Sequence, residues 1–198
     1  MPITEHRIHC ARNQAAKYCL DNNIDYLLFV DSDMGPDFRF LNPCAPKEQQ
    51  PEAREWAKPF TASSLNFMRT QYCGVIGAPA VSGPPQNKIN VFIPREGADP
   101  SRITDEEYAK TEPHFMNVWA IGTGLMLIDV ECFRRIKPPW FDDLWFDDYQ
   151  MDVRISQDSH FCVKCNMAGI PVFANLYAPA EHMKVQAQRP PDWVGSKK

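Results

Sequence analysis

Two aspartates separated by one residue directly follow a short apolar segment near the N-terminus. Residues 26–30 read Tyr-Leu-Leu-Phe-Val, and Asp31-Ser32-Asp33 comes next. A continuous apolar run of this length indicates a strand in the middle of a sheet, covered on both faces. Because ligands of open α/β sheets bind at the carboxyl ends of strands, we expect Asp31 and Asp33 to meet in one site.

Two carboxylates in one site repel each other, and a divalent cation removes that conflict. Such a cation can bridge the oxygens of a diphosphate and neutralise the charge that develops when a nucleoside diphosphate leaves. The triplet also allows a simpler interpretation, in which Asp31 caps a turn and Asp33 is solvated.

The segments around the triplet alternate between helical and strand-like patterns, which predicts an α/β architecture. We expect helices over 11–20, 61–70, 130–136 and 158–168, and strands over 26–30, 73–81, 89–94 and 170–176. Residues 115–129 predict a strand, a glycine turn at 122–124 and a second strand. We expect exposed loops over 42–59, 95–113 and the acidic, aromatic stretch 140–152.

Bulk composition narrows the class of protein. The chain has 198 residues, 44% hydrophobic residues and a formal net charge of -4. These values predict one globular domain over 1–187, followed by a polar tail over 188–198. The chain shows no basic stripe, so we expect no nucleic-acid partner. It shows neither a membrane-length apolar run nor a signal peptide, so we expect no transmembrane segment and a cytoplasmic location.

The seven cysteines are odd in number and scattered, which favours reduced thiols over a disulfide framework. Cys162 and Cys165 have the spacing of a zinc-binding pair. However, a zinc site needs a second pair of ligands, and His160 is the nearest candidate. Buried helical thiols are therefore the better interpretation.

Four segments, in their order and spacing, resemble GT-A-type glycosyltransferases, closest to the family-2-like type of phage and bacterial genomes. The first three are ARNQAAKYCLDNNIDYLLFVDSDM (11–34), AIGTGLMLIDVECFRRI (120–136) and SQDSHFCVKCNMAGIPVFA (156–174). The fourth is Glu181-His182. The resemblance implies a GT-A-like α/β fold, with a mixed, mostly parallel sheet flanked by helices.

The resemblance also implies a metal-dependent enzyme that moves a sugar from a UDP- or GDP-sugar to an acceptor hydroxyl. Asp31 and Asp33 would be ligands of Mn²⁺ or Mg²⁺ and would bind the diphosphate through it, and His182 would be the third metal ligand. Asp158 matches the general base of inverting members, which takes the proton of the attacking hydroxyl.

Other residues fall where the family binds its nucleotide-sugar. Arg12 belongs to the helix before the metal-binding triplet. Gly122, Thr123 and Gly124 would let the backbone approach the transferred sugar. Trp140, Phe141 and Trp145 could stack on sugar faces, and packing in the core or in a loop explains them equally well.

The sequence departs from the family pattern in two places. Gln157 replaces the glutamate that usually precedes the base. The family's first strand and helix, which normally hold the nucleobase, have no counterpart, so we expect an N-terminally shortened fold. A fragment and a naturally short relative both fit this observation.

Several alternatives remain open at the level of sequence. Asp158 could be an ordinary first-turn acid of a helix, and His182 an ordinary surface histidine. The acidic pairs at 142–143 and 147–148 favour a solvated, mobile loop over a site. A non-catalytic protein that binds nucleotides or carbohydrates would keep the same fold.

A haloacid-dehalogenase-like phosphotransferase is the third alternative. It would use Asp31 as nucleophile and Asp33 as acid/base. In that family the aspartates are usually followed by Gly-Thr or Gly-Val, whereas Met34-Gly35-Pro36 follows here.

Overall fold

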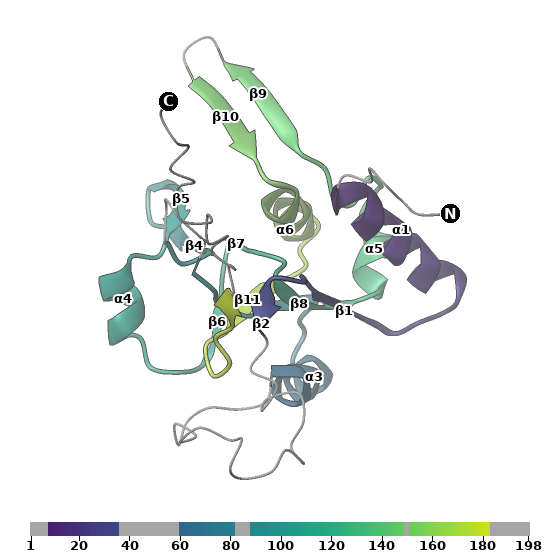
Figure 1. Cartoon of the computed structure of the whole chain (residues 1–198), viewed down its shortest axis with the longest axis horizontal. Helices are drawn as coiled ribbons and strands as arrows, with labels where there is room; N and C mark the ends of the chain where they lie inside the picture. Colours follow the sequence, from purple (N-terminus) through teal and green to yellow (C-terminus); the bar gives the residue numbers. More distant parts are fainter. Residues whose placement is uncertain (1–7, 36–59, 82–87, 149–150, 183–198) are drawn as a thin grey trace, which may run out of the picture.

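The computed structural model describes residues 8–35, 60–81, 88–148 and 151–182 (Figure 1). The side chains of 144–148, 151–155 and 181–182 lie outside this description. The expected loop over 42–59 and the expected tail over 188–198 fall outside it too. In the described part of the chain, no helix combines the length and apolar character needed to cross a bilayer.

The four predicted helices are present, and a fifth one falls in a segment predicted to be a loop. Their bounds are α1 Ile8–Asp21, α3 Phe60–Thr70, α4 Asp105–Lys110, α5 Glu131–Arg135 and α6 Gln157–Met167. The unexpected helix, α4, begins with a capping box: Thr104 accepts a hydrogen bond from the Glu107 backbone N–H, and the Glu107 carboxylate accepts one from the Thr104 N–H.

A five-stranded sheet forms the centre, in the order β1-β8-β3-β11-β6. Its strands are β1 Tyr26–Val30, β3 Val75–Gly77, β6 Phe115–Asn117, β8 Leu125–Asp129 and β11 Val172–Asn175. The sheet is mixed, as expected, but it is not mostly parallel. Only the β3–β11 pairing is parallel among the pairings of its described strands. The reason is that β8 lies between β1 and β3 and runs opposite to both.

The strand that leads into the aspartate triplet has the predicted bounds but a different position. β1 is an edge strand, and within the described residues its partner is β8 alone. Four of its five residues are half-buried, and Val30 is exposed. The expectation of a central strand is therefore wrong, although side chains on both faces of β1 pack against the core.

Helices cover both faces of the sheet (Figure 1), with α1, α5 and α6 on one face and α3 on the other. The alternation of side chains along β8 builds both layers. Met126 and Ile128 join the core on the α1–α5–α6 face. Leu125 and Leu127 join the core beneath α3. This two-sided burial explains why residues 125–128 form a continuous apolar run.

Three small sheets complete the described chain. A three-stranded sheet has the order β5-β4-β7, with bounds β4 Val91–Arg95, β5 Ala98–Arg102 and β7 Ala120–Ile121. β2 Met34–Gly35 directly follows the aspartate triplet and pairs with β12 Glu181–His182. The hairpin β9 Leu144–Asp148 and β10 Met151–Ile155 projects from the rest of the chain (Figure 1). This hairpin corrects the prediction of a loop over 140–152.

Candidate functional site

A cavity of about 310 Å³ lies at the edge of the sheet where β1 and β3 end and β8 begins. The pairing of Val30 with Leu125, and of Gly77 with Met126, brings these three strand ends together. The cavity is lined by Asp31, Met34, Ala80, Val81, Asn90, Phe92, Arg102, Gly122, Thr123, Gly124, Ser156, Asp158 and Ser159. A site at this edge is what the sequence predicted.

Asp31 is fixed at the rim of the cavity by its own backbone. Its N–H donates to the Gly124 carbonyl at 2.8 Å, and its carbonyl accepts from the Met34 N–H at 2.9 Å. The second bond closes a four-residue turn that contains Ser32 and Asp33. The end of β1 and the glycine turn before β8 are thereby locked together, although about ninety positions separate them.

The Asp31 carboxylate already has a cationic partner within the protein. Arg12 Nη2 donates to Oδ1 at 2.7 Å and to Oδ2 at 2.9 Å. The Arg12 side chain is 5% exposed and that of Asp31 is 29% exposed, and the guanidinium lies over the Phe29 ring at 5.7 Å. The sequence did not predict this ion pair, which offsets part of the repulsion expected between unpaired carboxylates.

Arg12, which the resemblance assigned to nucleotide-sugar binding, does not line the cavity. Its contacts place it behind Asp31. In this arrangement Arg12 can orient the carboxylate and offset part of its charge.

The backbones of Asp33 and His182 lie near that of Asp31. Asp33 is exposed within the turn and does not line the cavity. His182 pairs with Met34 in the register of β12 and β2, which puts its backbone beside the residue after Asp33. Its side chain is outside the described part of the chain.

The donor set fits a hard divalent cation in its chemistry, because carboxylate oxygens and an imidazole are ligands that Mn²⁺ and Mg²⁺ accept. The backbone register supports this by bringing the His182 strand to the aspartate turn. Among the described side chains, no group of three His, Cys, Asp or Glu is arranged to hold a metal ion.

The glycine turn 122–124 lines the cavity, as predicted, but protein side chains occupy the space that its glycines leave open. A Cβ at Gly122 would lie 2.5 Å from Asn90 Nδ2, and one at Gly124 would lie 2.6 Å from Met34 Sδ. A side chain at either position would require Asn90 or Met34 to shift. Thr123 between them is buried.

Asp158 reaches the same cavity from the first turn of α6. Its Oδ2 accepts a hydrogen bond from the Thr123 N–H at 3.4 Å, and its Oδ1 accepts one from the Ser159 N–H at 3.1 Å. Asp158 is therefore a first-turn acid of α6, and it also lines the cavity. The structure brings Asp31, the glycine turn and Asp158 together from three separate segments.

Asn13, the neighbour of Arg12, holds the loop before the projecting hairpin. Its Nδ2 donates to the carbonyls of His9 and Phe141, at 2.8 and 2.7 Å. Its Oδ1 accepts from the N–H groups of Trp140 and Phe141, at 2.8 and 3.1 Å. All four hydrogen-bonding positions of the amide are used, so the Arg-Asn pair fixes two separate parts of the chain.

Trp140 and Phe141 belong to the hydrophobic core and not to a sugar-stacking surface. The Trp140 indole N–H donates to the carbonyls of Phe133 and Ile136. Phe141 is fully buried and stacks on Phe161, with ring centroids 4.5 Å apart. The core-packing interpretation is confirmed for these two residues, and the Trp145 side chain lies outside the described part.

The remaining candidates with described side chains do not line the cavity. Cys162 and Cys165 are fully buried in α6, as predicted. Asp143 Oδ2 lies 3.9 Å from His9 Nδ1, at the base of the projecting hairpin. The side chains at 147–148 are outside the described part.

Three cavity residues, namely Asn90, Phe92 and Arg102, were not predicted from the sequence. They lie on β4 and β5 or next to them, in a wall that was expected to include a charged loop. A signal for this hairpin was present. Arg95 pairs with Ala98 around Glu96-Gly97, and Gly97 has a φ of 69°. A two-residue turn that ends in glycine is typical of a tight hairpin.

Comparison with known proteins supports the fold alone. No family model matches the chain, and no curated protein matches it in sequence. The chain is similar in structure to A197 from STIV, with a TM-score of 0.55 and 16% sequence identity. The match covers 91% of this chain and 69% of that one.

Proposed function

We propose that this protein is a metal-dependent glycosyltransferase that moves a sugar from a nucleotide-sugar to an acceptor hydroxyl. The observation that carries the proposal is the convergence of Asp31, the 122–124 turn and Asp158 on one cavity. The resemblance assigns these three segments to the metal, the sugar and the base, and they are far apart in sequence. An α/β fold with a mixed sheet between helices is compatible with this function, although a fold alone does not specify one.

Asp158 is the proposed general base of an inverting reaction. The acceptor hydroxyl must lose its proton as it attacks the anomeric carbon, and a positioned carboxylate can take that proton. The Thr123 and Ser159 N–H groups hold the carboxylate in place. A carboxylate has about four acceptor sites, so a hydroxyl in the cavity can still donate to it.

Asp31, Asp33 and His182 are the proposed ligands of Mn²⁺ or Mg²⁺. The metal would supply charge neutralisation at the diphosphate of the donor. Arg12 supports Asp31 from behind, and the turn closed by the Met34 N–H sets where Asp31 and Asp33 point. The donor would be a UDP- or GDP-sugar and the acceptor a hydroxyl compound.

A thermal-shift panel of UDP- and GDP-sugars, with and without Mn²⁺, tests donor binding. Release of the nucleoside diphosphate then tests turnover. We expect metal-dependent stabilisation that Asp33→Ala abolishes, and turnover that Asp158→Asn lowers by about 10²- to 10⁴-fold without loss of donor binding. Asp105→Asn, on exposed α4, is the control for loss of one carboxylate. Equal turnover in wild type and Asp158→Asn would contradict the proposed base.

One observation favours a second candidate, a protein of this fold that binds the donor without turnover. The Arg12 guanidinium engages both oxygens of Asp31 and so competes with a metal for them. This candidate predicts stabilisation by nucleotide in the same panel, with no release of nucleoside diphosphate from any donor. A phosphotransferase is less well supported, since no lysine stands among the described residues that line the cavity.

A further inference from the structure

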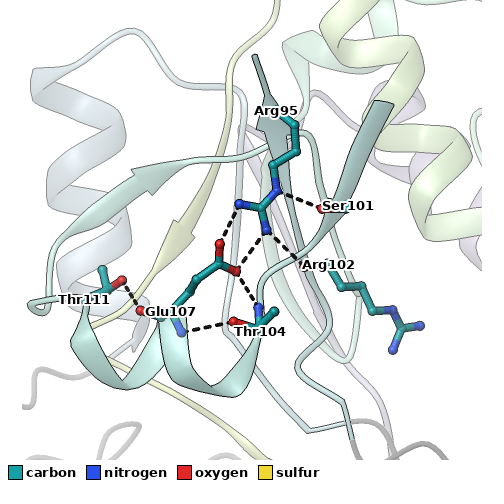
Figure 2. Close-up of polar contacts among 6 residues, drawn as sticks. All are labelled: Arg95, Ser101, Arg102, Thr104, Glu107 and Thr111. Atoms are coloured by element: carbon teal, nitrogen blue, oxygen red, sulfur yellow. Dashed lines mark hydrogen bonds and ion pairs between the residues drawn. The ribbon is translucent and has the colours of Figure 1, made fainter. Parts of the chain in front are cut away.

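The wall of the cavity formed by β4 and β5 is held by a polar network centred on Arg95 and Glu107 (Figure 2). Arg95 donates to the two Glu107 carboxylate oxygens at 2.6 and 2.9 Å, and to Ser101 Oγ at 2.8 Å. Arg95 Nη2 also donates to the carbonyl of Arg102 at 3.5 Å. The backbone of Arg102 is thus tied to α4, through Glu107, and to β4.

The Arg102 side chain takes no part in this network. Figure 2 shows its guanidinium directed away from Arg95 and Glu107. It lies over the Phe92 ring, 5.1 Å from the centroid, and both residues line the cavity. Arg102 as a whole is half-buried, but its Nη1 atom is buried and has no hydrogen-bond partner among the described residues.

The carboxylates of the cavity do not satisfy this cation. Asp31 is held by Arg12, and Asp158 by the Thr123 and Ser159 N–H groups. Within the described residues neither forms an ion pair with Arg102. A charged donor that is shielded from water and lacks an acceptor is costly. An oxyanion in the cavity would remove that cost.

We propose that Arg102 binds an oxyanion, a phosphate or a carboxylate, of the ligand that fills this cavity. The planar guanidinium offers paired N–H donors that match such a group, and the Phe92 ring holds the guanidinium by a cation–π contact. The proposal rests on the proposed function for the identity of the ligand, but the binding of an anion does not depend on sugar transfer.

Isothermal titration of the full chain with pyrophosphate, UDP, uridine, UDP-glucose and UDP-glucuronate tests the proposal. We expect Arg102→Gln to lower the affinity for the anions that Arg102 contacts by about 10- to 100-fold, because a charge-assisted hydrogen bond is lost. Arg102→Lys should recover part of the affinity. Arg134→Gln, which removes a charge from α5 outside this cavity, is the matched control and should change nothing.

The ligands separate the two sources of the anion. If Arg102 contacts phosphate, its replacement lowers the affinity for pyrophosphate and for UDP but not the affinity for uridine. If Arg102 contacts a sugar carboxylate, the replacement lowers the affinity for UDP-glucuronate more than the affinity for UDP-glucose. Equal affinities in wild type and Arg102→Gln, or no binding of any anion by wild type at millimolar concentration, overturn the proposal.

A measurement on the wild-type chain covers the case in which Arg102→Gln does not fold. Phenylglyoxal modifies arginine side chains, and mass spectrometry locates the modified residues. We expect the anion that binds to protect Arg102 and to leave Arg134 reactive. Anion-dependent protection of Arg102 without sugar transfer would retain this proposal and reject the proposed function. Sugar transfer by Arg102→Gln with an unchanged KM would retain the proposed function and reject the role of Arg102.

Discussion

Arg12 and Asp31 form the contact that ties the first helix to the cavity. The guanidinium of α1 donates to both oxygens of the carboxylate at the end of β1, across nineteen positions of sequence. Arg12 is almost completely buried, whereas Asp31 retains access to the cavity. The pair therefore has one structural member and one member that a ligand can reach.

The pair should contribute measurably to stability. Arg12→Met removes a charged hydrogen-bond donor and should lower the free energy of unfolding by about 2 kcal/mol, measured by urea denaturation. Lys17→Met is the control on the same helix, because the Lys17–Asp21 pair is exposed and should contribute less than about 0.5 kcal/mol. In a double-mutant cycle, Arg12→Met and Asp31→Asn should be non-additive. Additive effects would show that the two side chains do not interact in solution.

Asn13 should contribute as much as Arg12 to the free energy of unfolding, although it carries no charge. Asn13→Ala leaves the N–H groups of Trp140 and Phe141 and the Phe141 carbonyl without their partner. We expect the free energy of unfolding to fall by about 2 to 3 kcal/mol, as for buried polar groups left unsatisfied. Gln14→Ala, at an exposed position next along the helix, should stay within about 0.5 kcal/mol. Equal urea midpoints for the two variants would contradict the role of Asn13.

Elements with strong local patterns could be predicted from the sequence. α1, α3 and α6 appear where apolar periodicity and flanking breakers placed them, and β1 has the predicted bounds. These signals are local, because they depend on which side chains alternate along a single element.

Strand order and direction could not be predicted in the same way. The apolar run at 26–30 indicated a central strand, yet β1 is at the edge of the sheet. An edge strand whose two faces both pack against the core can be as apolar as a central one. The strand over 89–94 was predicted and corresponds to β4, but β5 and the β9–β10 hairpin fell in segments predicted to be loops, since their charged residues are typical of loops.

For the site, the sequence located the correct edge of the sheet but not the partners of its charged groups. Asp31, the 122–124 turn and Asp158 line the cavity. The Arg12–Asp31 pair and the position of Arg102 depend on how α1 and the β4–β5 hairpin pack against the sheet. These are tertiary contacts between segments far apart in sequence, for which no local pattern exists.

The Arg95–Glu107 contact should make the β4–β5 wall sensitive to acid. Hydrogen bonds from Arg95 and from the Thr104 N–H lower the pKa of Glu107 to about 2, from an ordinary 4.5. The stabilisation is complete above the ordinary pKa and is lost as the pH falls towards 2, because protonation removes the carboxylate.

Urea denaturation of wild type and Glu107→Gln at pH 6, 4 and 3 tests this dependence. We expect the difference in stability between the two proteins to be largest at pH 6 and to shrink as the pH falls. Glu106→Gln, whose pair with Lys110 is exposed, should differ little from wild type at every pH. A difference for Glu107→Gln that is constant from pH 6 to pH 3 would contradict the lowered pKa.

Burial should protect the cysteines of the core from alkylation. Burial raises the pKa of Cys73 and of Cys162 to about 12, and a hydrogen bond with Cys132, together with burial, raises that of Cys165. Because the thiolate is the reactive form, Cys162 should react with iodoacetamide at pH 8 roughly a thousandfold more slowly than an ordinary thiol. Among the cysteines of the described residues, Cys10, which is half-buried on α1, should be modified first. Mass spectrometry after timed labelling checks the order, with protein in guanidinium chloride as the control in which all these thiols react. Labelling of Cys162 as fast as Cys10 in the folded protein would show that α6 opens readily, and that the first turn carrying Asp158 is not the rigid support described above.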